Sequence, residues 1–209
     1  MIENPLAAFV ALFVVIGPLE AAPIFLALTQ RLDSAQRRRT ALLATVIAAG
    51  VLLAFALGGG AALAGIGISM PAFRIGGGIL LLLVAVDLLF ARASGLSSIT
   101  AREEAEAQAA HEIAVFPIAI PLLAGPGAMT GVVLLMDAAR GSLAAGLSVI
   151  AILLLVMALT LAILLLAEAI LRVLGIIGLN VVSRISGILL AALAVQFMLD
   201  GIKASGVLG

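Results

Sequence analysis

The chain has no cysteine, tryptophan or tyrosine, and it holds a single histidine, His111, among 209 residues. Without cysteine it forms neither disulfides nor thiolate metal sites, and one histidine cannot build a histidine metal cluster. The missing tryptophan and tyrosine remove the aromatic belt that often marks the borders of membrane spans. Charged residues make up only 11%, and the formal net charge is zero, so no nucleic-acid partner is expected.

Apolar residues are abundant instead. They make up 65% of the chain, with a mean hydropathy of +1.37, whereas ordinary globular proteins are about 45–50% apolar. A bilayer span needs about 20 apolar residues. We therefore expect an all-α membrane protein with six transmembrane helices, over residues 5–29, 40–66, 71–91, 113–136, 143–171 and 181–199.

The basic residues indicate an orientation. Three are expected on one side of the bundle: Arg74, Arg140 and Lys203. The other eight lie between spans one and two, three and four, and five and six: Arg31, Arg37, Arg38, Arg39, Arg92, Arg102, Arg172 and Arg184. By the positive-inside rule these eight are cytoplasmic. We predict a multi-pass protein of the cell inner (plasma) membrane, with both termini extracytoplasmic and a polar cytoplasmic linker over residues 93–112.

The two halves of the chain resemble each other. FVALFVVIGPLEAAPIFLALT in the first span parallels FPIAIPLLAGPGAMTGVVLLMD in the fourth, and GISMPAFRIGGGILLLLVAV in the third parallels GLNVVSRISGILLAALAV in the sixth. Arg74 then matches Arg184. Because each half holds three spans, an odd number, the second enters the membrane inverted, as in many secondary transporters. We predict inverted three-helix repeats over residues 1–92 and 113–209.

A Gly-Pro pair lies near the middle of the first span and of the fourth. Proline breaks or kinks a helix, and glycine takes the freed dihedral angles. The exposed backbone groups must face protein or a water-filled cavity, and the half-helix that follows directs its positive end there, where a carboxylate fits. The candidate substrate-binding residues are Gly17, Pro18, Glu20, Gly125, Pro126, Gly127 and Thr130. The alternative is a kink that serves packing only.

The candidates for coupling or gating are Glu20, Arg74 and Arg184. Glu20 is the third residue of the half-helix that begins at Pro18, where it could relay a proton, bind a substrate ammonium, or itself fill the anion-friendly helix end. Arg74 and Arg184 open the third and sixth spans, and they either snorkel to the interface or form gating or fold-fixing contacts at opposite faces.

Other polar residues are expected to be structural. Glu168 and Arg172 have the spacing of an ion pair along one helix. Asp137, near the end of a span, is expected to contact water, and Gln196 to hydrogen-bond a neighbouring helix.

Three stretches resemble the MarC family of bacterial and archaeal membrane proteins, within the LysE-like amino-acid exporter superfamily: GISMPAFRIGGGILLLLVAVDLLF, FPIAIPLLAGPGAMT and VVSRISGILLAALAVQFMLDGI. The resemblance implies six spans, an inner-membrane location and, in some members, neutral amino-acid transport. The family usually reads close to DPIGNIPIF where this chain has GPLEAAPIF, with Gly17 for the acidic residue, Ala21 for the asparagine and a new Glu20. The AGPGAMT motif of the fourth span is retained.

The leading expectation is a secondary transporter that exports small neutral amino acids or related metabolites by alternating access. Its partners would be a small-molecule substrate, H⁺ or Na⁺, the lipid bilayer and, as a further option, other copies in a homo-oligomer. The alternatives are a passive channel or facilitator for small solutes, and a non-transporting membrane scaffold. Neither enzyme activity nor a cofactor or metal is expected, since His111 lies in the linker and paired membrane aspartates are missing.

Overall fold

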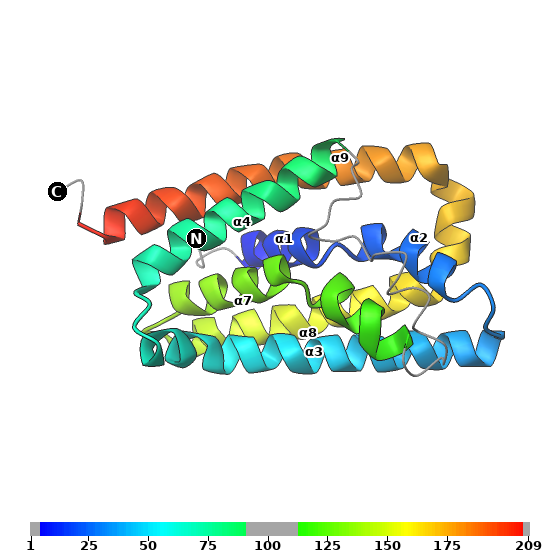
Figure 1. Cartoon of the computed structure of the whole chain (residues 1–209), viewed down its shortest axis with the longest axis horizontal. Coiled ribbons are helices and arrows are strands. Elements are labelled where there is room, and N and C mark those ends of the chain that lie inside the picture. The colour runs from blue at the N-terminus through cyan, green and yellow to red at the C-terminus, as the bar shows by residue number, and fades with distance from the viewer. Residues whose placement is uncertain (1–4, 91–112, 207–209) are drawn as a thin grey trace.

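The computed structural model describes residues 5–90 and 113–206, and the regular elements in these ranges are all helices. They are α1 (Pro5–Ile16), α2 (Pro18–Leu28), α3 (Ser34–Gly65), α4 (Met70–Phe90), η1 (Ala114–Leu123), α7 (Pro126–Ala138), α8 (Leu143–Leu165) and α9 (Ala167–Ala204). Figure 1 shows them side by side along one long axis. The predicted linker over 93–112, with His111, lies outside the described residues.

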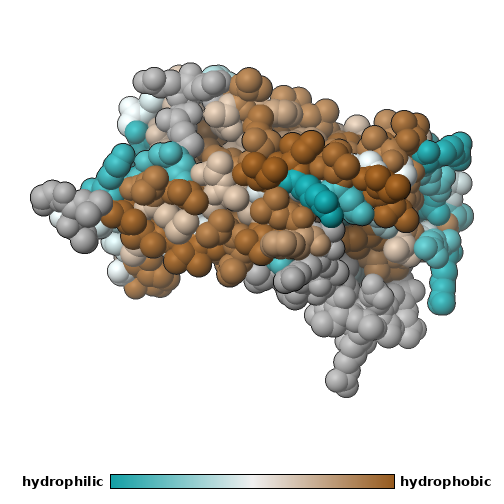
Figure 2. Space-filling model, turned by 90° about the horizontal axis from the view of Figure 1, so that it is seen from above, coloured by the Kyte–Doolittle hydropathy of each residue, from teal (hydrophilic) through white to brown (hydrophobic). Residues whose placement is uncertain are grey.

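The described helices form five spans long and apolar enough to cross a membrane, or six if η1 and α7 count as one span bent by 55°. The helices α1 and α2 together make a single span over Pro5–Leu28. Apolar residues cover much of the face in Figure 2, and hydrophilic residues gather mainly toward the two ends of the molecule, with one small hydrophilic patch within the apolar area. The expectation of an all-α, multi-span membrane protein is therefore confirmed.

The junction between the last two spans differs from the prediction over 143–171. The helix α8 ends at Leu165, and α9 begins at Ala167 and leaves helical geometry at Gly175 (φ 62°, ψ 179°). The short segment before Gly175 joins the two spans at one end of the bundle (Figure 1). The predicted span extended to 171 because residues 166–171 are apolar apart from Glu168, whereas the turn itself lies at Gly175, where a positive φ is accessible to glycine at little cost.

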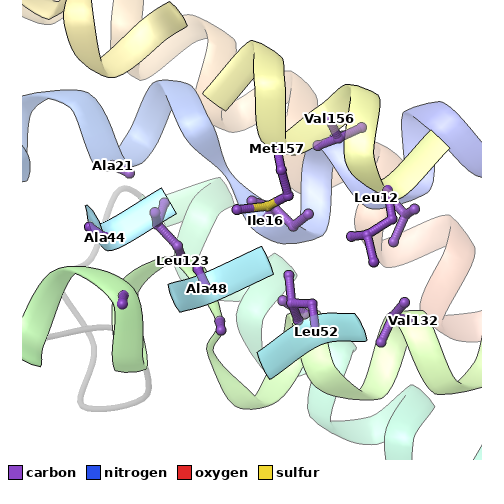
Figure 3. Packing of buried hydrophobic residues seen from close by; sticks show 14 of the residues in the cluster. Leu12, Ile16, Ala21, Ala44, Ala48, Leu52, Leu123, Val132, Val156 and Met157 are labelled. Carbon is purple, nitrogen blue, oxygen red and sulfur yellow. The ribbon is translucent and has the colours of Figure 1, made fainter. Parts of the chain in front are cut away.

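The first and fourth spans meet in the interior, with α1 against α7 and α2 against η1. The helix α3 packs on both halves of the fourth span, and α8 packs on both halves of the first. Figure 3 shows the core between them, where Leu12 and Ile16 meet side chains from α3, α8 and the fourth span. Burial of these apolar side chains packs the interrupted helices together, although Gly17 and Gly125 are half-buried and Pro126 is exposed.

The helices α4 and α9 form the most extensive helix pair of the described chain. Glycines allow this close approach, because an added Cβ would lie 2.8 Å from the Ala194 carbonyl oxygen at Gly78 and 2.9 Å from the Ala85 carbonyl oxygen at Gly187. Small residues at helix contacts are a common basis of association in membranes, where apolar burial gives little drive.

Candidate functional site

The fourth span is interrupted between Leu123 and Pro126. Pro117 and Pro121 lack backbone N–H donors, and η1 has wide π-helical turns around them, with extended backbone at Phe116 and Ile120. Gly125 is extended (φ −78°, ψ 171°), and Pro126 begins α7. A Cβ at Gly125 would lie 2.6 Å from the Pro121 carbonyl oxygen, so the site excludes any side chain.

The N-terminus of α7 has no side-chain cap within the described residues. The first α7 residue, Pro126, has no N–H, and Met129 N–H bonds the Gly125 carbonyl oxygen at 3.0 Å. Gly127 and Ala128 lie between Pro126 and Met129. Their backbone N–H groups belong to the first turn, where a helix offers no carbonyl acceptor of its own. The second interruption therefore presents the positive end of a helix and two backbone donors without a hydrogen-bond partner among the described residues.

A small cavity of about 40 Å³ lies at this helix end. Its lining includes Gly125, Pro126 and Gly127, together with Val15 of α1 and Val84 of α4. A cavity needs about 10–15 Å³ of such space to hold one water molecule. In this conformation the cavity therefore has room for a few water molecules and not for an amino acid.

The first span is interrupted at Gly17, which has left-handed backbone (φ 62°, ψ 51°), and Pro18 begins α2. Hydrogen bonds continue on both sides, because Gly17 N–H bonds the Phe13 carbonyl oxygen at 3.1 Å and Ala21 N–H bonds the Gly17 carbonyl oxygen at 2.9 Å. Unlike η1 and α7, the two halves stay in line as one span.

The Glu20 carboxylate occupies the N-terminus of α2. It contacts its own backbone N–H and the hydroxyls of Ser183 and Ser186 on α9, and its Oε2 would lie 3.3 Å from a Cβ at Gly17. The Oε1 atom is buried without a hydrogen-bond partner among the described residues. The first interruption is thus filled by a carboxyl group of the protein itself, whereas the second has no side-chain cap among the described residues.

The structure brings only some of the predicted site residues together. Gly125, Pro126 and Gly127 line one cavity, and Val15, two residues before Gly17, joins them there. Glu20 instead contacts serines of α9. Thr130 lies against Gly77 of α4, where a Cβ added to the glycine would lie 2.5 Å from Cγ2 of Thr130.

Arg74 and Arg184 match in sequence but differ in surroundings. Arg74 Nη2 lies 2.6 Å from Asp137 Oδ2, and Arg140 Nε lies 3.3 Å from Asp137 Oδ1. The Asp137 side chain is only 7% exposed, so the expectation that it contacts water is wrong. Arg184 is exposed on α9. Packing of α4 against α7 brings Arg74 to Asp137, although the two residues are 63 positions apart in sequence.

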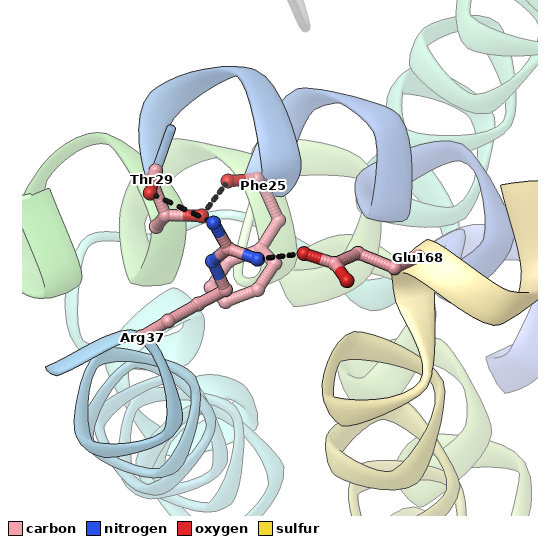
Figure 4. Close-up of polar contacts among 4 residues, drawn as sticks. All are labelled: Phe25, Thr29, Arg37 and Glu168. Atoms are coloured by element: carbon pink, nitrogen blue, oxygen red, sulfur yellow. Dashed lines mark hydrogen bonds and ion pairs between the residues drawn. The ribbon is translucent and has the colours of Figure 1, made fainter. Parts of the chain in front are cut away.

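Glu168 pairs across the bundle and not along its helix. Arg37 of α3 donates from Nη1 to Glu168 Oε1 and from Nη2 to the Thr29 carbonyl oxygen at 3.4 Å (Figure 4). The predicted pairing of Glu168 with Arg172 is therefore wrong. Gln196 likewise bonds Asp200 on its own helix, at 2.9 Å, and not a neighbouring one.

These features define a multi-span helical membrane protein with an uncapped helix end inside its fourth span. The model of the MarC family of integral membrane proteins matches residues 3–205. The chain is 37% identical over 198 residues to UPF0056 membrane protein MJ1677 of Methanocaldococcus jannaschii, and 35% identical over 198 residues to UPF0056 inner membrane protein YhgN of Escherichia coli, covering 95% of each chain in both cases. No solved structure matches it. The chain belongs to the MarC family.

Proposed function

We propose that this protein is a secondary transporter of the inner membrane that exports small neutral amino acids or related metabolites. The observation that carries the proposal is the open helix end at Gly125 and Pro126, inside an apolar span. The name of its relative YhgN supports the inner-membrane location, and the resemblance to LysE-like exporters supports the direction of transport.

The backbone donors of Gly127 and Ala128 suit a substrate carboxylate. A helix N-terminus binds anions through free N–H groups and the helix dipole together. Inside an apolar bundle each unsatisfied N–H costs several kcal/mol, so a ligand that accepts both hydrogen bonds gains this energy. Apolar walls from Val15 and Val84 favour a small neutral side chain on the bound amino acid.

Glu20 is the proposed coupling residue. Its carboxylate and the hydroxyls of Ser183 and Ser186 offer oxygen atoms to H⁺ or Na⁺, and an intramembrane carboxylate has a high cost unless it is neutralised. Because Glu20 belongs to the first span and the serines to α9, cation binding would link the two halves of the chain.

Alternating access would arise from two inverted three-helix repeats that rock against each other. The packing supports this arrangement, because equivalent helices of the two halves make equivalent contacts. The helix α3 of the first half packs on the fourth span, and its counterpart α8 packs on the first span. The contact of α1 with α7 likewise corresponds to the contact of η1 with α2. The cavity of about 40 Å³ requires such a motion before an amino acid can enter.

Flux measurements in proteoliposomes test the proposal. We expect uphill movement of a small neutral amino acid, such as alanine, when a proton or sodium gradient is imposed. Glu20→Gln should remove the dependence on the gradient and leave downhill exchange, because the amide has no charge for a cation to neutralise. Asp200→Asn, at the far end of α9, is the matched control and should stay coupled.

Two other outcomes would contradict the proposal. Flux that runs only downhill in the wild type, whatever the gradient, would identify a passive facilitator. No flux of any amino acid across a panel, from protein that remains monodisperse in detergent, would favour a membrane scaffold.

A further inference from the structure

Two ion pairs join the first half of the chain to the second. Arg74 of α4 pairs with Asp137 of α7, and Arg37 of α3 pairs with Glu168 at the start of α9. Both pairs cross the boundary along which the proposed repeats would move. Arg140, by contrast, binds Asp137 from within the second half.

The two pairs lie at opposite ends of the bundle. Arg37 is near the start of α3, whereas a Cβ at Gly60, near its end, would touch Arg140 beside Asp137. At a rise of 1.5 Å per residue the stretch between Arg37 and Gly60 is about 35 Å long, close to the roughly 30 Å of a bilayer core. Figure 1 shows the two ends of α3 at opposite ends of the molecule.

Each pair borders a pocket that opens at its own end. Asp137 and Arg140 line a pocket of about 300 Å³ with residues near the end of α3. Arg37 and Glu168 line one of about 770 Å³ between the start of α3 and the end of α8. The small cavity at Gly125 is a separate space. The structure thus has both ion pairs formed while the space at Gly125 is too small for an amino acid.

We propose that these ion pairs are the two gates of the transporter, and that each breaks when its own end opens. The inference rests on the proposed alternating-access function. Separating the halves at one end exposes both charges of that pair to water, and the pair at the other end stays closed. The state with both pairs formed is the occluded one. Arg184, which is exposed, has no part in either gate.

The gates differ in strength. Asp137 is 7% exposed and Arg74 is 23% exposed, whereas Glu168 is 63% exposed. Removing one partner of a buried pair has a large effect, because the other charge stays buried and unpaired, whereas an exposed pair contributes little. Loss of Asp137 should therefore shift the equilibrium between the open states further than loss of Glu168.

Thiol labelling tests this inference independently of transport. The chain has no cysteine, so Val84→Cys places one reporter at the central cavity. In membrane vesicles of both orientations, an impermeant maleimide should label it slowly from either face. Asp137→Asn should raise the labelling rate several-fold from one face and lower it from the other. Glu168→Gln should change both rates in the opposite sense and by a smaller factor.

Two controls separate gating from general loosening. Arg140→Gln removes a charge from Asp137 without breaking a pair between the halves. Arg38→Gln removes a neighbour of Arg37 that forms no ion pair within residues 5–90 and 113–206. Neither variant should change the labelling rates. The double variant Arg37→Glu with Glu168→Arg should restore wild-type labelling.

Equal changes from both faces, or none in either gate variant, would overturn the inference. The opposed labelling pattern in a protein that moves no amino acid would instead retain the gates and contradict the proposed substrate.

Discussion

Glu20 makes the two interruptions of this protein chemically unequal. Both spans have a glycine followed by a proline at the interruption, yet only α2 carries an acid in its first turn. The carboxylate lies against the helix end and leaves no place for a second anion there. A substrate carboxylate is therefore expected at Gly127 and Ala128.

At the scale of the residue, we predict that Gly125→Ala abolishes transport. The new methyl group would lie 2.6 Å from the Pro121 carbonyl oxygen, a backbone atom that cannot move aside cheaply. Such overpacking costs about 1–3 kcal/mol and would displace the start of α7. Amino-acid flux in proteoliposomes and the Tm in detergent measure the two effects.

Gly131→Ala is the matched control for this substitution. Its Cβ would meet Val15 at 3.4 Å, an ordinary contact, on the same helix, so flux should remain. Wild-type flux by Gly125→Ala would show that the interruption does not need glycine.

At the scale of the element, proline and glycine have different effects on the helices. Prolines inside η1 weaken its hydrogen-bond ladder, and the glycine at the end of this segment allows a bend of 55°. Glycines of α4 and α9 have another effect, since Gly78 and Gly187 let α4 pack closely against the part of α9 after Gly175. The interrupted spans thus lie beside a closely packed helix pair.

We predict that Gly78→Ala and Gly187→Ala each destabilise the protein by about 1–3 kcal/mol. Their Cβ atoms would lie 2.8 Å and 2.9 Å from backbone oxygens of the partner helix. Gly58→Ala, on α3 with nothing within 4 Å, should instead leave stability unchanged or raise it by up to about 1 kcal/mol. Unfolding in detergent measures all three. Equal stability of the three variants would show that close contact at Gly78 and Gly187 does not stabilise the packing of α4 against α9.

At the scale of the whole molecule, the arginine distribution predicts which end faces the cytoplasm. The start of α3, with Arg37, Arg38 and Arg39, would lie inside, and the end of α9 outside. The Arg74–Asp137 gate would then close the extracytoplasmic end, and the Arg37–Glu168 gate the cytoplasmic end.

Two serine-to-cysteine variants test this orientation. Ser205→Cys, exposed beyond α9, should react with an impermeant maleimide added to right-side-out vesicles, and Ser34→Cys, exposed at the start of α3, should react only in inside-out vesicles. Both sites are exposed and carry the same conservative change, so accessibility alone separates them. The reverse pattern would invert the assignment of both gates.

The sequence by itself determined the membrane class, the approximate spans and the positions of both interruptions. These properties depend on local composition: runs of about 20 apolar residues, and Gly-Pro pairs that no continuous helix tolerates well. The candidate residues Gly125, Pro126 and Gly127 were predictable for the same reason.

The tertiary structure alone decided which charges meet. Glu168 has a suitable partner four residues away in Arg172, yet it binds Arg37, 131 residues away in sequence. The turn at Gly175 and the burial of Asp137 likewise follow from packing between helices. Spacing along one helix limits which pairs can form, whereas packing brings distant residues together and sets the exposure that determines the strength of each pair.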